Sequence, residues 1–468
     1  MDVAVSTGHG VGKPFSESRA FALQRAFYAE ASGEAFAEIP HQVVDNPFVS
    51  SAYARVVVGF LRDCARGALD LDEPLYVVEL GAGAGRFAHG FMRELADWTA
   101  ALPFALPPIV YVLTDLGDRM LEEWDAHPAF AGDRFDFARF DVETDSTLRL
   151  RRRGVTLERL ANPLVVIANY LFDSVPVDAF AFGGGAIEEC LLAVDGQDVP
   201  SMELRWSRRA VGPDHYGEPD LDALLEHYRT TLGDTVVTIP RVGIDCLRRL
   251  RALADDRLLV LVGDKAHATE ASLAHGSEPE LDRHGGSFSV MVNVHALGWY
   301  ARRHGGDLLH GGDRHVAVAA AALLLGGEHP ETRLAYADAI ERFSPQDLSF
   351  LAEGVEQAAE HLSVAELVAL LRLSGWDAST LLGVASALRT QAAEADPAAQ
   401  RDLLHALHET YARHVFVPGE EDLPFALGLL AFELDALEDA IRFFEASLAE
   451  HGPDDATQRN LDLCRGLL

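Results

Sequence analysis

An acidic residue and three closely spaced glycines follow an apolar run near residue 80. The run Leu75–Leu80 is rich in β-branched and aliphatic residues, and in the segment LYVVELGAGAGR the acid is Glu79 and the glycines are Gly81, Gly83 and Gly85. Such a run predicts a strand buried on both faces. Glycines allow a sharp turn and let the backbone come close to a ligand. We expect these four residues to form one wall of a nucleotide site.

The spacing of the glycines separates two classes of ligand. A dinucleotide fingerprint, G-x-G-x-x-G, would need its third glycine at position 86, where this chain has Arg86. The pattern E-x-G-x-G-x-G, with the acid at the strand end, is similar to the S-adenosylmethionine (SAM) loop of class I methyltransferases. The alternative is a tight strand-to-helix turn that binds nothing, because one glycine motif is a weak signal without its context.

Side chains suited to the rest of SAM follow the next two predicted strands. Asp115 ends the second strand, and its carboxylate could accept both ribose hydroxyls. Phe140 and Asp141 end the third, where an aromatic ring can pack on adenine and an acid can accept its amino group. Ligands of a doubly wound sheet bind outside the carboxyl ends of its strands, so we expect these residues in one crevice. Each acid taken alone could instead be a solvated loop residue or a helix cap.

The fourth predicted strand ends in residues that could act on a methyl acceptor. Asn169, Tyr170 and Asp173 follow Leu164–Ala168 directly. A carboxylate beside the acceptor can orient it or take its proton, so Asp173 is the first catalytic candidate and Tyr170 the second. Asn169 is expected on the cofactor side. Alternatively, Asp173 caps a helix that follows the strand, since aspartate is favoured there regardless of chemistry.

These elements predict an α/β fold with a doubly wound, Rossmann-like methyltransferase sheet. Strands and helical stretches alternate along the middle of the chain, which implies a parallel sheet. The strands are expected at Leu75–Leu80, Ile109–Thr114, Phe135–Phe140, Leu164–Ala168 and Leu258–Val262. An insert at about 180–250, first extended and then helical, would form a substrate region or lid. We expect an N-terminal helical segment at 1–67, a methyltransferase domain at 68–327 and a helical domain at 328–468.

The helical end of the chain resembles a tetratricopeptide unit. Leu427, Gly428, Ala440 and Phe444 fall at the spacing of a 34-residue repeat, and Leu461 lies one period after Leu427. The alternative is an ordinary helical hairpin. Helical repeats build extended binding surfaces, so these helices are expected to recruit a protein or peptide acceptor or to mediate self-association into a homo-oligomer.

Two segments taken together resemble the MidA-like family of class I SAM-dependent methyltransferases. They are VVELGAGAGRFAHGFMREL and VVIANYLFDSVPVDAF, and the family includes the mitochondrial arginine methyltransferase that assists complex I assembly. The family's fourth strand typically ends in A-N-E-x-F-D-A-x-P, matched here by Ala168, Asn169, Phe172, Asp173 and Pro176, with Tyr170 in place of the glutamate.

The resemblance implies SAM as cofactor and methyl transfer to a protein or peptide side chain, of which an arginine nitrogen is one candidate. Because Tyr170 departs from the family pattern, two alternatives stay open. The first is a methyltransferase acting on a small molecule or natural product. The second is a SAM-binding assembly or scaffold protein without transfer activity.

Composition excludes several other classes. The chain has 73 acidic against 39 basic residues and a net charge of −34, so the basic footprint of a nucleic-acid binder is missing. Its four cysteines are far apart, which argues against a metal site and a disulfide framework. The first residues lack the apolar core of a signal peptide, and the longest apolar run, Val316–Leu325, is too short to span a membrane. We expect a reduced, cytoplasmic protein that binds no membrane.

Overall fold

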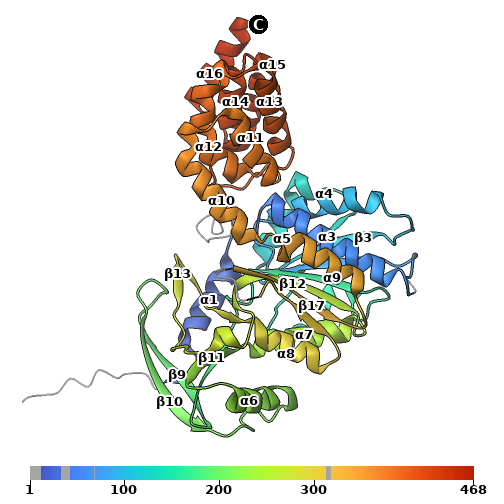
Figure 1. The fold of residues 1–468 in the computed structure, drawn as a ribbon, viewed down its shortest axis with the longest axis vertical. Coiled ribbons are helices and arrows are strands. Elements are labelled where there is room, and N and C mark those ends of the chain that lie inside the picture. Colours follow the sequence, from blue (N-terminus) through green and yellow to red (C-terminus); the bar gives the residue numbers. More distant parts are fainter. Residues whose placement is uncertain (1–11, 33–42, 68, 313–317) are drawn as a thin grey trace, which may run out of the picture. The chain divides into compact units, whose positions relative to one another are not determined.

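The computed structural model describes residues 12–32, 43–67, 69–312 and 318–468, and Figure 1 shows the fold. The chain divides into two compact units, each with its own internal packing. The sheet unit comprises 1–40, 56–83 and 102–342, and the helical unit comprises 41–55, 84–101 and 343–468. The domain boundaries expected from the sequence stay predictions.

The sheet unit contains a large, mostly parallel sheet. Its strand order is β16-β17-β12-β7-β2-β3-β4, and β15 pairs with the end of β12. All five strands expected from the sequence are present. The bounds are β2 Leu75–Leu80, β3 Ile109–Asp115, β4 Phe135–Arg139, β7 Leu164–Asn169, β12 Leu258–His267, β15 Val292–Asn293, β16 Asp307–Leu309 and β17 Val318–Leu325. Strand β17 runs antiparallel to both of its neighbours, β12 and β16.

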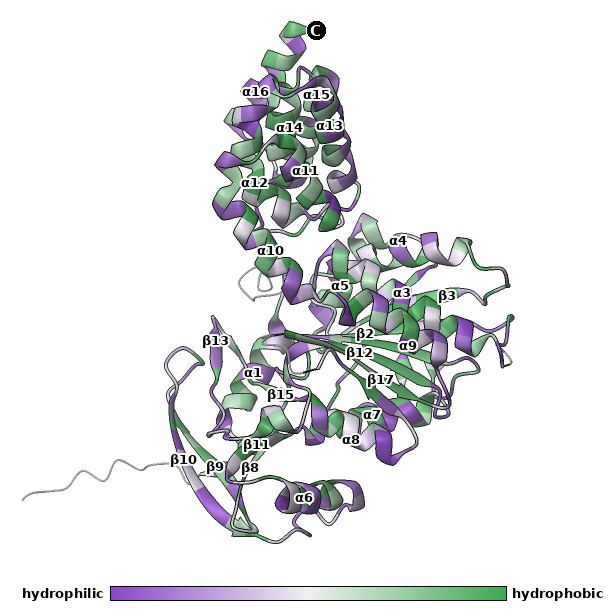
Figure 2. Cartoon of the chain, in the orientation of Figure 1, coloured by the Kyte–Doolittle hydropathy of each residue, from purple (hydrophilic) through white to green (hydrophobic). Residues whose placement is uncertain are grey.

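The order in which the chain forms the strands of this sheet reverses at β2. Strands β3 and β4 lie on one side of β2, and β7 and β12 lie on the other, all parallel to it. A ligand of such a sheet binds where the order reverses, outside the carboxyl ends of the strands. Every residue of β2 is buried, as a central parallel strand requires. Figure 2 shows β2, β12 and β17 as mainly hydrophobic.

Helices of the sheet unit supply apolar faces to the same core. In α7, residues such as Leu247 and Leu250 recur at helical spacing and join the cluster that contains Val78 and Val260. The helices wholly within this unit are α1 Arg19–Glu30, α5 Asp118–Ala126, α6 Pro219–Thr231, α7 Arg241–Leu253, α8 Val294–Arg303 and α9 Pro330–Tyr336. Helix α3, Pro47–Cys64, contributes residues to both units.

The insert forms most of a second sheet, whose strands β9 and β10 are drawn in green in Figure 1. Its order is β1-β9-β8-β11, with β10 paired to β9. The strands are β1 Lys13–Pro14, β8 Asp178–Gly183, β9 Ala186–Asp195, β10 Glu203–Val211 and β11 Thr235–Ile239. The β8–β9 turn has Gly184 and Gly185 at φ +56° and +78°, the left-handed pair that a two-residue hairpin turn requires. Extended structure was expected for β8 to β10, whereas β11 was not anticipated.

Two short hairpins complete the strands. They are β5 Leu148–Arg149 with β6 Thr156–Leu157, and β13 Asp282–His284 with β14 Ser287–Ser289. Within the described residues, no helix is both long enough and apolar enough to cross a membrane.

The helical unit confirms an all-helical C-terminal region. Its helices are α4 Arg86–Ala100, α10 Pro345–Ala358, α11 Val364–Leu373, α12 Ala378–Gln391, α13 Pro397–Tyr411, α14 Leu423–Glu433, α15 Leu437–His451 and α16 Asp455–Leu467. Helices α14 and α15 pack closely because Gly428 faces the ring of Phe444, where a Cβ would lie only 2.6 Å away. Both the tetratricopeptide interpretation and the ordinary hairpin fit this contact, so the repeat stays a prediction.

Candidate cofactor site

The loops that follow neighbouring strands are joined at the carboxyl edge of the large sheet. Three backbone hydrogen bonds connect them: Ala82 N–H to Thr114 O at 3.0 Å, Phe140 N–H to Asp115 O at 3.0 Å, and Tyr170 N–H to Gly263 O at 2.8 Å. The ends of β2 and β3, of β3 and β4, and of β7 and β12 are therefore adjacent. This arrangement brings the residues predicted for a SAM site to one edge, where the strand order reverses.

The glycine loop turns as its sequence predicts. Gly81, Gly83 and Gly85 have φ values of +66°, +53° and +81°, which glycine adopts without strain. A Cβ on Gly81 would also lie 3.2 Å from Cδ1 of Leu171. The indole N–H of Trp124 donates to the carbonyl of Gly83 at 3.0 Å and holds the loop in place. Gly85 precedes α4 directly.

Glu79 is fixed inside the sheet. Its side chain is 3% exposed, and its Oε2 accepts a hydrogen bond from the hydroxyl of Tyr111 at 2.8 Å. Its backbone carbonyl accepts from Oγ1 of Thr114 at 2.7 Å. The position of the acid at the strand end is as expected, and its contact with a cofactor stays a prediction.

Asp115 is a buried acid whose partners are backbone groups. Its Oδ1 accepts the N–H of Leu116 at 2.7 Å and of Gly117 at 3.2 Å. Burial raises the pKa of Asp115 to about 6, and the two backbone donors only partly oppose this effect. Among the described residues, backbone N–H groups donate to this carboxylate, which suits a ligand that donates hydroxyl groups, as ribose does. The hydrogen-bond acceptor at this edge therefore fits the ribose hydroxyls of the expected cofactor.

Asp141 lies at the end of β4 and is paired with a cation. Arg25 of α1 contacts both of its oxygens, with Nη1 3.2 Å from Oδ1. Burial alone would raise the pKa of Asp141, but the hydrogen bond and charge of Arg25 outweigh it and hold the pKa below its usual value. The neighbouring Phe140 is 4% exposed and belongs to the main core. Adenine contacts for Phe140 and Asp141 stay predictions.

The loop after β7 has an unusual backbone. Tyr170 has φ +48°, a conformation that non-glycine residues seldom adopt and that is common at functional sites. Asp264, fully buried near the end of β12, accepts the backbone N–H of Phe172 through Oδ2 at 3.2 Å. Asn169 ends β7 at the same edge. Asp264 was not among the predicted site residues.

Asp173 is buried and does not cap a helix. The chain turns after it and enters strand β8, so the helix-cap alternative is wrong. Its side chain is 2% exposed, and Ser174 Oγ donates to Oδ1 at 2.8 Å. Burial raises the pKa of Asp173 to about 6. A carboxyl group that titrates near neutrality can accept a proton from an acceptor and release it again.

Asp264 and Asp173 form an interacting pair of acids. Burial, and then the nearby charge of Asp173, raise the pKa of Asp264 well above its ordinary value. Two interacting carboxyl groups in a buried place resist ionising together, so the pKa of Asp264 is held above that of Asp173.

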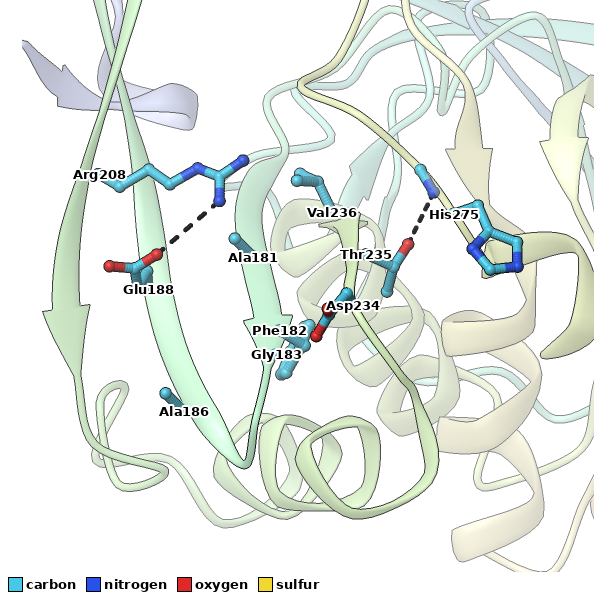
Figure 3. Close-up of a pocket in the computed structure, with 11 residues that line it drawn as sticks. Ala181, Phe182, Gly183, Ala186, Glu188, Arg208, Asp234, Thr235, Val236 and His275 are labelled. Atoms are coloured by element: carbon cyan, nitrogen blue, oxygen red, sulfur yellow. Dashed lines mark hydrogen bonds and ion pairs between the residues drawn. The ribbon is translucent and has the colours of Figure 1, made fainter.

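A hollow lined mainly by the insert contains none of the predicted site residues (Figure 3). Its volume is about 430 Å³, and residues of β8, β9, β10 and β11 line it. Arg208 pairs with Glu188 at 3.8 Å on one wall, and Thr235 Oγ1 accepts the N–H of Gly276 at 2.8 Å on the other. In the part of the chain that the structure describes, no three histidine, cysteine or acidic side chains are grouped to hold a metal ion.

Comparison with known proteins finds one family model that matches part of the chain. Residues 54–252, from α3 to the end of α7, match a family model described as "Putative S-adenosyl-L-methionine-dependent methyltransferase". The predicted methyltransferase resemblance is confirmed. The cofactor named by this methyltransferase family is SAM, which confirms the cofactor predicted from the glycine loop. No curated protein matches the chain.

Two solved structures from Burkholderia thailandensis are similar to this chain. The first is a native crystal structure of an uncharacterized superfamily protein, 15% identical, covering 70% of this chain and 91% of its own, with a TM-score of 0.43. The second is described as a "likely methyl transferase" bound to S-adenosyl-homocysteine. It is 15% identical, covers 71% of this chain and 92% of its own, and has a TM-score of 0.42.

Proposed function

We propose that this protein is a class I SAM-dependent methyltransferase that transfers a methyl group to a protein or peptide side chain. One observation carries the proposal most directly. Two buried acids, Asp115 and Asp173, lie at the carboxyl edge of a sheet whose strand order reverses at β2, and a left-handed glycine loop follows β2 at the same edge. Such an edge is where a doubly wound sheet binds its ligand.

The residues of the chain divide the work of methyl transfer. Gly81 and Gly83 let the backbone approach the cofactor, and Asp115 would accept its ribose hydroxyls. SAM supplies an electrophilic methyl group on a sulfonium. The protein must align an acceptor in line with that group and exclude water. Asp173 orients the acceptor and takes its proton, because its pKa of about 6 lets it exchange protons near neutrality.

The acceptor side of the proposal concerns Tyr170. The loop that also carries Asp173 holds the backbone of Tyr170 at φ +48°, which fixes the direction of its Cα–Cβ bond. A hydroxyl in place of a carboxylate can orient an acceptor without attracting a cation strongly. We therefore propose a neutral or weakly basic side chain as the first acceptor to test. A guanidinium is the less suited candidate.

Recruitment of a macromolecular acceptor is assigned to helices α10–α16. These helices expose large apolar side chains, of which Phe350 is 56% exposed, Leu351 42% and Leu373 44%. Apolar side chains at the surface of packed helices support binding of another polypeptide.

The proposal is tested in two steps with the full-length protein. Calorimetric titration with S-adenosyl-homocysteine measures cofactor binding, and Asp115→Ala should weaken that binding at least about tenfold, as the loss of a charge-assisted hydrogen bond predicts. The matched control is Asp118→Ala, an exposed acid three residues later. Absence of binding by the unaltered protein would overturn the proposal.

The second step follows tritiated methyl groups from SAM into fractionated lysate. Label in protein fractions supports the proposed acceptor class, and label only in small molecules replaces it. Asp173→Ala should abolish transfer while cofactor affinity stays nearly unchanged. Full transfer by Asp173→Ala would remove Asp173 from the mechanism.

A further inference from the structure

Helix α1 reaches the same edge of the sheet from the N-terminal part of the chain. Gln24 donates through Nε2 to the carbonyl of Ser174 at 2.7 Å, and its Oε1 accepts the N–H of Phe288 at 2.7 Å. One residue later, Arg25 contacts Asp141 at the end of β4. Because Ser174 follows β7 and Asp141 follows β4, α1 extends across the ends of the strands between them.

The next turn of α1 brings Tyr28 beside the acid at the end of β3. A Cβ on Gly117 would lie 2.9 Å from the carbonyl oxygen of Ala29 and 3.4 Å from that of Tyr28. Gly117 also donates its N–H to Asp115. The helix backbone therefore packs directly on the loop that holds Asp115.

The phenol of Tyr28 links the two buried acids. It forms side-chain hydrogen bonds with Ser174 and Ser287, and burial, then the charges of Asp173 and Asp115, raise its pKa. Ser174 Oγ donates to Asp173 Oδ1 at 2.8 Å. Since that hydroxyl gives its proton to Asp173, its oxygen can accept from Tyr28. Tyr28 and Asp173 are therefore both neighbours of the Ser174 hydroxyl.

We propose that α1 completes the SAM site, with Tyr28 as a positioning residue between Asp115 and Asp173 and Arg25 as the cation that fixes Asp141. This inference rests on the proposed function of the site. Through Ser174, the hydroxyl of Tyr28 favours the ionised form of Asp173 and sets its direction. Arg25 holds the carboxylate of Asp141 in one orientation. Together they cover the crevice and help to exclude water from it.

Other charged groups face this network from the elements packed around it. Lys265 pairs with Asp282 at 2.9 Å, and both act on Asp173, Lys265 favouring its charge and Asp282 opposing it. Asp264 and Asp173 interact directly, and Glu143 shares Arg25 with Asp141. None of these groups is changed in the variants below, so a shift between variants reports on α1.

The test is calorimetric titration of the full-length protein with S-adenosyl-homocysteine from pH 5 to 8. Its ribose hydroxyls favour an ionised carboxylate, so affinity should rise as Asp115 loses its proton. Tyr28→Phe removes one hydroxyl and should weaken binding roughly threefold to tenfold. In transfer of tritiated methyl groups into lysate, Tyr28→Phe should also move the midpoint of the pH dependence upward, because Asp173 loses a partner that favours its charge. Arg25→Gln should weaken binding as well.

Matched controls separate these effects from general damage. Tyr411→Phe removes a hydroxyl that contacts Glu450 in the helical unit, and Arg19→Gln removes an exposed charge from the first turn of α1. Neither should change affinity or the pH midpoint. Binding by the unaltered protein with both α1 variants unchanged would overturn the inference alone. Absence of binding by the unaltered protein would overturn the proposed function with it.

A second measurement needs no variant. Hydrogen exchange of the α1 amides, residues 19–30, should slow when S-adenosyl-homocysteine is added, because a helix that covers the ligand is held closed by it. Unchanged exchange in α1, with slowed exchange in the glycine loop, would show that the ligand binds without α1 and would overturn the inference.

Discussion

Asp264 accepts the backbone N–H of Phe172 at 3.2 Å, so an acid at the end of β12 fixes the loop at the end of β7. That loop contains Tyr170 at φ +48° and presents Asp173. A fully buried acid is costly unless it is neutral or paired. Asp264 therefore holds the loop after β7 in place. The chemistry of this loop depends on whether Asp264 or Asp173 carries the proton.

Replacement of Asp264 should separate its hydrogen bond from its charge. Asp264→Asn keeps an oxygen that can accept from Phe172, so the unfolding free energy should stay within about 1 kcal/mol of the original at pH 5. Asp264→Ala leaves the buried N–H unpaired and should cost about 1–3 kcal/mol. Chemical denaturation of both variants measures this difference. Equal losses in the two variants would mean that the hydrogen bond does not hold the loop.

Asp173 should make the protein less stable as pH rises. Its pKa is raised to about 6, so the folded state keeps a proton that the unfolded state has already released. Stability is therefore present below the unfolded pKa, near 4, and is lost as pH rises through about 6. Asp173→Asn avoids this loss and should exceed the original by about 2–3 kcal/mol at pH 8, with little difference at pH 4.

Denaturation at the two pH values checks this prediction, with Asp133→Asn as the exposed control. A gain that is the same at pH 4 and pH 8 would assign the effect to packing instead of charge. The sign also implies a trade-off between stability and activity, because the ionised acid that destabilises the fold is the one proposed to take the proton.

The strands and the glycine loop could be predicted because their signals are local. The bounds of β2 agree with the predicted run Leu75–Leu80, since a buried parallel strand shows its pattern within the strand itself. Asp115 and Asp141 were found by the same reasoning about strand ends. Asp264 was missed although the signal was present: it lies two residues after the predicted end of the fifth strand at Val262.

Arg25 and Tyr28 had no comparable signal. The Arg25–Asp141 contact joins residues 116 positions apart, and nothing in either segment indicates the other. Which helix covers a sheet edge is decided by packing of the whole unit. The fold of α1 onto β14 and β9 depends on burial of Phe21 against Phe288, which no local pattern reveals.

Gly81 should be required by its conformation and by its neighbour. Gly81→Ala places a Cβ at φ +66° and 3.2 Å from Leu171, and the left-handed conformation costs about 1–2 kcal/mol for alanine. Gly154 is a matched control, with φ +67° and no atom within 4 Å of a built Cβ. Both variants should lose similar stability, but only Gly81→Ala should lose affinity for S-adenosyl-homocysteine. Unchanged affinity in Gly81→Ala would remove the glycine loop from the cofactor site.

Gly428 should control the packing of α14 on α15. Gly428→Ala places a Cβ 2.6 Å from the ring of Phe444, and overpacking of this kind costs about 1–3 kcal/mol, more than the helix propensity that alanine gains. Gly466 of α16 faces open space, so Gly466→Ala should be neutral or slightly stabilising. Adding Phe444→Leu to Gly428→Ala should recover part of the loss, because the smaller side chain leaves room for the methyl group.

Two measurements test this prediction. Denaturation gives the stability of each variant, and hydrogen exchange of residues 423–451 in the folded protein locates the effect. Faster exchange confined to these helices in Gly428→Ala, reversed in the double variant, is expected for a close contact between the two helices. Stability losses that simply add in the double variant would show that Gly428 and Phe444 do not interact. The contact between α14 and α15 would then depend on the buried leucines of α14, among them Leu427 and Leu430, and would not require Gly428.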